Sequence, residues 1–170
     1  MPPWPTAAQD GESLTHHDNG QDWIVSWHRP STPPEGTPHG AAGICITPDG
    51  KVVLVELDGR WEIPAGRTEG TETWEETLRR EMMEEACAVV VEAKLLGFGR
   101  SQCIRGTQEG HVIVRSMWRA AVELLPWEPK FEIPERLVVP ADQVRDRLAY
   151  PKSEGMARFT VRMLDEAGIP

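Results

Sequence analysis

The chain has 170 residues, of which 39% are hydrophobic, and it carries a formal net charge of −9 at pH 7. This length and apolar content suit one globular domain with a proper core, so no second domain is needed. The acidic balance argues against general nucleic-acid binding and against binding to an anionic membrane, because both polyanions would be repelled. A phosphorylated small molecule stays open as a ligand if a metal ion neutralises both partners.

The first 21 residues are rich in proline, glycine and polar residues and show no periodic apolar pattern. We therefore expect a flexible arm over residues 1–21 and a single domain over residues 22–170. The opening MPPWPTAAQDGE lacks the basic start and apolar run of a secretion signal, and no stretch is long enough to span a membrane. The three cysteines show no C-x-x-C spacing, which disfavours a disulfide framework or a thiolate zinc site and favours a cytoplasmic location.

Short apolar runs predict the first strands of a sheet. Residues 23–27, WIVSW, predict a first strand, and the four prolines in residues 29–40 mark that segment as a linker. Residues 41–47 and 52–57 predict two central strands. The residues Pro-Asp-Gly at 48–50 lie between these runs and predict a hairpin turn.

The segment from residue 66 to residue 88, GRTEGTETWEETLRREMMEEACA, carries the most informative pattern. Six positions follow the spacing G-x5-E-x7-R-E-x-x-E-E, namely Gly66, Glu72, Arg80, Glu81, Glu84 and Glu85. On a helix with about 100° per residue, the last three acids fall within an arc of roughly 100°. An overlapping arc holds the apolar stripe of Trp74, Leu78 and Met82, so the three acids point the same way as the core side chains.

A second acidic set on this helix has a different environment. Glu75, Glu76 and Arg79 lie opposite the apolar stripe, with Arg80 at the border, and they read as a solvated face with favourable i,i+4 pairs. The inward acids, in contrast, crowd like charges beside apolar surface, so they must take up protons, gain a cation or destabilise the fold. Mg²⁺ or Mn²⁺ is the favoured remedy, because sites made only of oxygen suit hard cations.

Beyond the helix, residues 89–97 and 111–125 predict further strands, with a polar loop at residues 106–110 between them. The chain then ends on a predicted helix, capped by Ser153, whose apolar residues recur at helical spacing: Met156, Phe159, Met163 and Leu164. Together these elements predict an α/β fold in which a mixed sheet is flanked by helices, an α/β/α sandwich.

The spacing described above resembles the box of the Nudix hydrolases, G-x5-E-x7-R-E-U-x-E-E-x-G-U, where U is a bulky apolar residue, here Met82. The stretch WEIPAGRTEGTE, at residues 61–72, is similar to the strand and loop that enter the box. The resemblance covers roughly residues 40–150 and implies a Nudix-type α/β/α sandwich with the Nudix loop-helix. Two positions depart from the pattern. Cys87 replaces the usual glycine, which often ends a helix in the left-handed conformation, and Ala88 is smaller than the usual apolar residue.

The activity implied by the resemblance is attack of water on a diphosphate phosphorus with the help of Mg²⁺ or Mn²⁺. The resemblance, together with their i,i+4 spacing on the inward face, makes Glu81 and Glu85 the expected direct metal ligands. Glu84 either binds a second metal ion or orients the attacking water. The family pattern also implies a backbone carbonyl ligand at Ala65 or Gly66, and an ion pair between Arg80 and Glu72 that ties the loop to the helix.

The catalytic base is not set by the box, because several family members carry it on a later loop. Glu132 occupies a comparable position before the apolar run at residues 137–139, and Glu135 follows closely. Glu109 is a third candidate. A solvated loop acid is the alternative interpretation for each of them.

Several side chains are candidates for substrate binding. Arg67 follows the box glycine and is expected to meet a phosphate, with a solvent-exposed arginine as the alternative. Arg105 is expected to do likewise, as are Arg100 and Arg115. Trp61 is a candidate for stacking on a nucleobase, as is Trp27, although burial in the sheet competes with that role.

The substrate itself stays open among nucleoside triphosphates, nucleotide sugars and ADP-ribose. The leading hypothesis is a pyrophosphohydrolase for a nucleoside diphosphate linked to another group. The alternative is a Nudix-fold module that senses a ligand or binds a protein with little or no turnover. A homodimer also stays open as the assembly of the chain.

Overall fold

We describe a computed structural model of the chain, which covers residues 2–129 and 133–170. In this part of the chain, nine strands form one mixed sheet with the order β1-β2-β7-β8-β3-β4-β5, while β6 pairs with β3 and β9 pairs with β4. The N-terminal strands are β1 (Leu14–Asp18), β2 (Gln21–His28), β3 (Thr37–Ile46) and β4 (Lys51–Leu57). The later strands are β5 (Arg60–Glu62), β6 (Ala65–Arg67), β7 (Ala88–Arg105), β8 (Val112–Leu124) and β9 (Arg136–Pro140).

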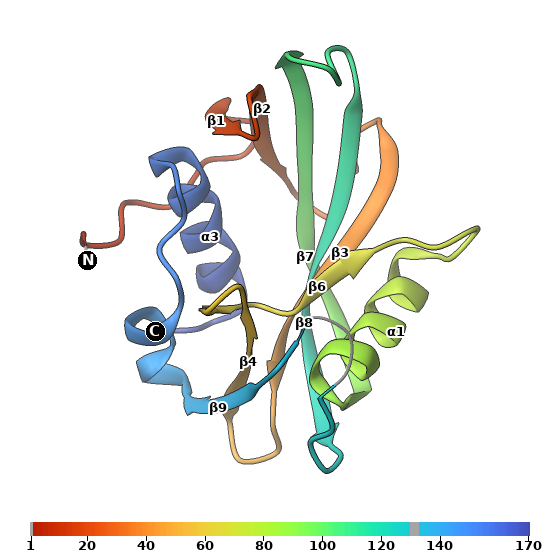
Figure 1. The fold of residues 1–170 in the computed structure, drawn as a ribbon, viewed down its shortest axis with the longest axis vertical. Coiled ribbons are helices and arrows are strands. Elements are labelled where there is room, and N and C mark those ends of the chain that lie inside the picture. Colours follow the sequence, from red (N-terminus) through yellow and green to blue (C-terminus); the bar gives the residue numbers. More distant parts are fainter. Residues whose placement is uncertain (1, 130–132) are drawn as a thin grey trace.

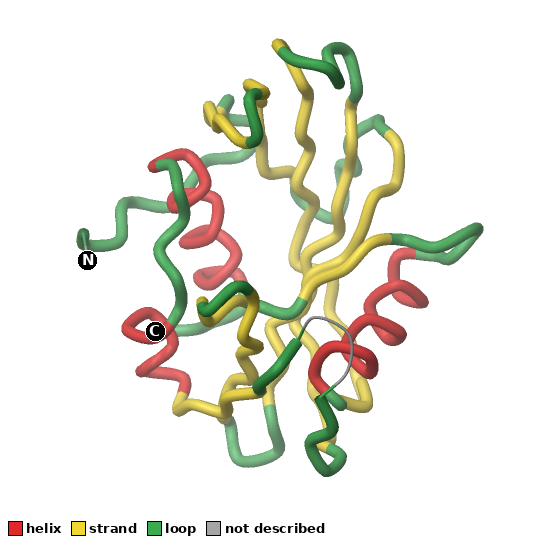
Figure 2. Tube along the Cα trace, in the orientation of Figure 1, coloured by secondary structure: helices red, strands yellow, loops and turns green. Residues whose placement is uncertain are grey.

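Two long helices cover opposite sides of the sheet, as Figures 1 and 2 show. Helix α1 (Trp74–Ala86) packs beside β3 and β7, and α3 (Glu154–Glu166) packs beside β1 and β2. A short 3₁₀ turn, η1 (Ala141–Gln143), and a single helical turn, α2 (Val144–Arg147), precede α3. The predicted α/β/α sandwich is therefore confirmed. No helix in the described residues is long and apolar enough to cross a membrane.

Alternating side chains of the central strands fill two separate cores. In β4, Val52 and Leu54 join the core under α3, which includes Phe159 and Leu164. Val53 and Val55 join the core under α1, which includes Leu78 and Met82. Because successive residues of a strand point to opposite faces, a continuous apolar run is what a strand covered on both faces requires.

The predicted strands and turns of the central region agree with the structure in kind. Strands β3 and β4 pair antiparallel, with Ile46 opposite Val52 across the predicted hairpin. Strand β7 runs further than predicted, to Arg105, and β3 starts at Thr37, inside the segment assigned to a linker. The cap of the last helix is confirmed, since the Ser153 hydroxyl accepts a hydrogen bond from the backbone N–H of Met156 at 3.2 Å.

The N-terminal segment differs most from expectation. We expected no regular element in residues 1–21, yet Leu14–Asp18 forms β1 and pairs antiparallel with β2. The sequence LTHHD carries almost no apolar signal, because only Leu14 of this strand is buried. Further upstream, Ala8 is buried and the Trp4 indole Nε1 donates to the Arg145 carbonyl at 2.8 Å. The flexibility of the arm stays a prediction.

Candidate active site

The site begins with the chain between β5 and α1. Strand β6 pairs with β3, so that Ala65 lies opposite Ala42 and Gly66 opposite Ala41. A loop then leads to Thr73, which caps α1. Its hydroxyl accepts the N–H of Glu76, and the Glu76 carboxylate accepts the N–H of Thr73. This capping box fixes the start of the helix and with it the rotation of every later side chain.

Helix α1 turns its two acidic sets in the predicted directions. Glu75 and Glu76 are exposed, whereas Glu81 is buried and Glu84 and Glu85 are half-buried. Leu78 and Met82 lie in the core on the same side as the three inward acids. The helical wheel drawn from the sequence is therefore confirmed for both faces.

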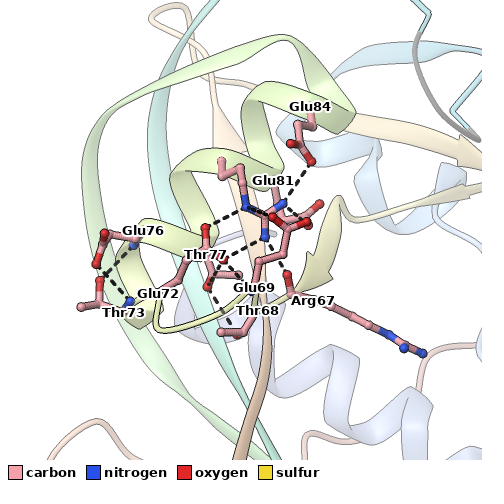
Figure 3. A network of polar contacts seen from close by, with 10 residues as sticks. Arg67, Thr68, Glu69, Glu72, Thr73, Glu76, Thr77, Glu81 and Glu84 are labelled. Carbon is pink, nitrogen blue, oxygen red and sulfur yellow. Dashed lines mark hydrogen bonds and ion pairs between the residues drawn. The ribbon is translucent and has the colours of Figure 1, made fainter.

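Arg80 ties the loop to the acidic face of the helix through Glu72 and Glu84, two partners that Figure 3 labels. Its guanidinium donates to both carboxylate oxygens of Glu72, at 2.7 and 3.0 Å, so the predicted ion pair is confirmed. The same group donates to the Arg67 carbonyl at 2.7 Å, and its Nη1 reaches Glu81 at 2.8 Å and Glu84 at 3.0 Å. Hydrogen bonding to Glu72 raises the pKa of Arg80, so the guanidinium stays charged.

The Glu81 carboxylate lies directly against the backbone of Gly66. A Cβ atom at residue 66 would overlap this carboxylate, so only glycine allows the approach. Burial raises the pKa of Glu81 above its ordinary value of 4.5, although Arg80 opposes the shift. Next to it, a carboxylate oxygen of Glu85 accepts the N–H of Ala65 at 3.1 Å. Residues 65 and 66 thus lie on the acidic face of α1.

Helix α1 ends in the left-handed conformation despite the missing glycine. Cys87 has φ 49° and ψ 43°, and its N–H bonds back to the carbonyls of Met82 and Met83. The helix exit typical of a glycine is therefore kept by a residue that carries Cβ, at a cost in strain. The Cys87 thiol is buried and donates to the Glu128 carbonyl at 3.6 Å.

A cavity of about 620 Å³ opens on the other side of β6. Its wall includes Ala65, Gly66 and Arg67 of β6, and its apolar part is formed by side chains of β8 and α3: Met117, Met156, Phe159 and Met163. The same three residues of β6 thus separate the acidic face of α1 from the cavity. A substrate that fills the cavity would reach the carboxylates at this strand.

The predicted site residues divide into two groups. Ala65, Gly66 and Arg67 line the cavity, and Arg80, Glu81, Glu84 and Glu85 gather behind β6. Trp61 and Arg105 are not brought there. Trp61 packs half-buried against the core under α3, and its carbonyl accepts the N–H of Ala149 at 2.9 Å. Arg105 ends β7 and pairs with Asp22 at 2.6 Å.

The candidates for the catalytic base lie apart from the cavity or outside the described chain. Glu132 lies outside the described residues. Glu135 is exposed just before β9, and its carbonyl accepts the N–H of Glu56 at 3.0 Å. Glu109 is exposed in the turn between β7 and β8. Neither of these two glutamates lines the cavity.

Sequence reasoning missed Glu62, an acid on the cavity wall. Burial raises its pKa above the ordinary value of 4.5, and its partner Arg60 opposes the shift at an Nε–Oε1 distance of 3.4 Å. A single acid in a short strand gives no periodic signal. Its place two residues before the Pro-Ala-Gly stretch at 64–66 was the available hint.

The candidate metal ligands at β6 and α1 suit a hard divalent cation. All of them are oxygens, from the carboxylates of Glu81, Glu84 and Glu85 and from backbone carbonyls. Within residues 2–129 and 133–170, no three acidic, histidine or cysteine side chains already converge on one point. Mg²⁺ needs only one or two carboxylates and keeps several waters, so a preformed cage is not required. The bare backbone at Gly66 lets Glu81 reach β6, where the carbonyls lie.

Comparison with known proteins adds three findings. The family model described as NUDIX domain matches residues 37–162. A variant of the Bacillus subtilis pyrophosphohydrolase BsRppH superposes with a TM-score of 0.65 at 24% identity, over 92% of this chain and 99% of that chain. No curated protein matches the chain.

Two further solved structures share the fold at lower identity. The MutT protein from Methanosarcina mazei has a TM-score of 0.56 at 16% identity, over 78% of this chain and 97% of that one. The NUDIX domain of Shewanella oneidensis NrtR, solved with ADP ribose, has a TM-score of 0.54 at 17% identity, over 78% of this chain and 90% of that one.

Proposed function

Because the chain belongs to the Nudix family, whose hydrolases act on phosphoric anhydrides, we propose that it cleaves the diphosphate bond of a nucleoside diphosphate linked to another group. The observation that carries this proposal is the set of inward carboxylates on α1, held against β6 at the wall of a cavity of about 620 Å³. A substrate in the cavity would present its diphosphate to these groups.

The reaction depends on Mg²⁺ or Mn²⁺ in this proposal. Glu81 and Glu85 would hold the ion together with a carbonyl of Ala65 or Gly66, and Glu84 would bind a second ion or orient the attacking water. When bound, the cation offsets the negative charge of the diphosphate oxygens, which otherwise repel the attacking water.

The protein's own groups position and deprotonate that water. Glu84 is our candidate for accepting its proton, because it is half-buried at the edge of the cluster, whereas Glu81 is enclosed. Glu132 is the other candidate for this role. Arg80 holds Glu81 and Glu84 in place through its Nη1 and anchors them to the loop through Glu72. It acts as a positioning residue.

The rest of the substrate occupies the cavity, with Arg67 at its polar edge. The apolar side chains of β8 and α3 suit the faces of a nucleobase and ribose. The substrates that we propose to test are nucleoside triphosphates, nucleotide sugars and ADP-ribose. We also propose a cytoplasmic location, which three free cysteines support.

A panel of these substrates, assayed with Mg²⁺ or Mn²⁺ and with a phosphatase or pyrophosphatase that converts the products to inorganic phosphate, tests the proposal. We expect turnover of at least one compound that stops on addition of EDTA. If the panel instead gives thermal stabilisation without turnover, the chain is a ligand-sensing module. The NrtR domain solved with ADP ribose is an example of a Nudix-type fold that holds such a compound.

The first mutational prediction concerns Glu85. Glu85→Gln is expected to lower turnover at least roughly 100-fold, because a neutral amide is a poor ligand for a hard cation. The matched control is Glu75→Gln on the exposed face of the same helix, which removes only a surface pair with Arg79. Steady-state kinetics of both variants, with circular dichroism to check folding, measure the difference. Equal turnover in the two variants would remove Glu85 from the site.

A further inference from the structure

Two exposed arginines line one edge of the cavity. Arg67 in β6 and Arg115 in β8 lie on either side of β3, where both pair with Gly40. Neighbouring strands are about 4.8 Å apart, so the two residues are two strand spacings from each other. Residues paired in this way share one face of the sheet.

That face is the one covered by α3. The preceding residue Gly66 faces the Glu81 carboxylate under α1, so Arg67 points the other way, as Figure 3 shows. In β8, Trp118 belongs to the core under α1 and Met117 to the core under α3, which places Arg115 on the α3 face as well. Both arginines line the cavity.

Neither guanidinium has an acidic partner among residues 2–129 and 133–170. The acids on the cavity wall are largely committed elsewhere. Glu62 pairs with Arg60 at 3.4 Å, and Asp18 lies 3.8 Å from the Lys152 ammonium group. The two arginines thus form a positive edge that the protein does not neutralise.

Both arginine side chains are exposed, and the charge on each acts on the groups near the other. Partial desolvation of its guanidinium lowers the pKa of Arg115, and the charge on Arg67 lowers it further. The pKa of the His39 imidazole is lowered by burial and then by both arginines. Two like charges at the edge of a cavity are stabilised by an anion with several oxygen atoms, because guanidinium groups bind such anions bidentately.

We propose that Arg67 and Arg115 together bind a phosphoryl group of the substrate that is not itself attacked. This inference rests on the proposed hydrolase function and narrows its substrate class. A nucleotide with a phosphate beyond the scissile linkage, such as a nucleoside triphosphate, is preferred over one whose appended group is neutral, such as ADP-ribose. Gly66 faces the carboxylates, and the next residue of β6, Arg67, faces the cavity. A substrate whose scissile diphosphate lies at the carboxylates would therefore place its next phosphate at the arginines.

The binding test uses tripolyphosphate with EDTA present, so no metal contributes. We expect tripolyphosphate to raise the melting temperature of the wild-type protein, and Arg67→Gln or Arg115→Gln to abolish the rise. The matched control is Arg29→Gln, which removes an exposed charge that pairs with Asp10 outside the cavity. Inorganic phosphate serves as the second probe. If it binds as tightly as tripolyphosphate, the pair is a site for free phosphate and the inference is wrong.

The kinetic test compares a nucleoside triphosphate with ADP-ribose. For Arg115→Gln we expect KM for the triphosphate to rise roughly tenfold with kcat little changed, since one charge-assisted hydrogen bond is worth about that factor, while KM for ADP-ribose stays the same. Arg115→Lys should recover part of the loss. An equal rise for both substrates would mean that the pair binds the scissile diphosphate, which overturns the inference. Failure of the proposed function gives a different result from failure of this inference, because the wild-type protein would then hydrolyse neither compound.

Discussion

Gly66 is the point at which the backbone of β6 contacts a carboxylate of the candidate site. Its lack of a side chain lets the Glu81 carboxylate lie against β6, and this contact brings an acid from α1 beside the backbone of Gly66. The sequence pattern indicates that a glycine stands there. The structure supplies the reason, which is close approach of a side chain rather than an unusual backbone angle.

Gly66→Ala is accordingly expected to lose hydrolytic activity by at least roughly 100-fold and stability by about 1–3 kcal/mol, because the new methyl group overlaps the Glu81 carboxylate. Urea denaturation and steady-state kinetics measure the two effects. In a Glu81→Ala background the overlap is gone, so the stability cost of the alanine should vanish. An equal cost in both backgrounds would refute the steric explanation.

At Cys87, in contrast, the backbone angle itself is unusual for the residue that adopts it. The helix end needs a left-handed residue, and the chain provides it with φ 49° at a residue with a Cβ atom. The strain is tolerated because the N–H of Cys87 satisfies two helix carbonyls and the thiol is buried.

Cys87→Gly and Cys87→Ala separate the strain from the packing of the thiol. Both variants lose the buried sulfur, but only glycine releases the left-handed strain. We expect the glycine variant to be more stable than the alanine variant by about 1 kcal/mol, as judged by urea denaturation. A more stable alanine variant would show that the helix end is unstrained.

At the scale of elements, the loop before α1 and the helix act as one unit. Arg80 joins them by donating to Glu72 and to the Arg67 carbonyl, while its Nη1 holds two of the inward acids. The loop therefore cannot shift without disturbing the carboxylates. This coupling explains how a residue that need not touch the substrate affects the reaction.

The Glu72 pair also predicts a pH dependence of stability. Hydrogen bonding to Arg80 lowers the pKa of Glu72 from 4.5 to about 2. A lowered pKa in the folded state means that the ion pair stabilises fully above the unfolded value of 4.5, and that this stabilisation is lost as the pH falls toward 2. Glu72→Gln should thus be less stable than wild type at pH 7, and the gap should close between these two values. Melting temperatures across pH 2–7, with Glu75→Gln as a control, would reveal it. A gap that is independent of pH would contradict the assignment.

For the whole molecule, the N-terminal segment joins α3 to the sheet. Asp10 pairs with Arg162 at 2.6 Å, and Glu12 forms two hydrogen bonds with Arg158. The Trp4 ring lies 5.0 Å from that of Tyr150, in the loop before α3 whose neighbouring residues line the cavity. Helix α3 and the cavity wall are thereby linked to residues that the sequence assigns to an arm.

Deletion of residues 2–12 tests whether this segment is an arm or part of the domain. We expect a loss of stability on the order of 2 kcal/mol or more, since Ala8 and the Trp4 contact leave the core and two arginines of α3 lose their partners. Deletion of residues 2–3 alone, which are exposed, is the control and should have little effect. Equal stability of the two truncated proteins in urea would restore the interpretation of a loose arm.

Prediction from the sequence succeeded where a pattern is local. The acidic and apolar faces of α1, the hairpin between β3 and β4, and the cap at Ser153 each depend on residues within a few positions of one another. It failed for β1, whose residues are mostly polar, and it placed Trp61 and Arg105 in a site that they do not reach. The spacing of residues along the chain does not predict which distant segments come into contact.

The sequence by itself determined the box, the wheel of α1 and the sandwich of helices on a mixed sheet, because helix and strand periods follow from backbone geometry alone. Only the tertiary structure decided that Glu81 contacts Gly66, that Arg115 and Arg67 pair with the same residue of β3, and that the first residues pack on α3. These contacts join segments far apart in the chain. Sheet order and strand register set them, notably the parallel pairing of β3 with β8, and no local repeat specifies that choice.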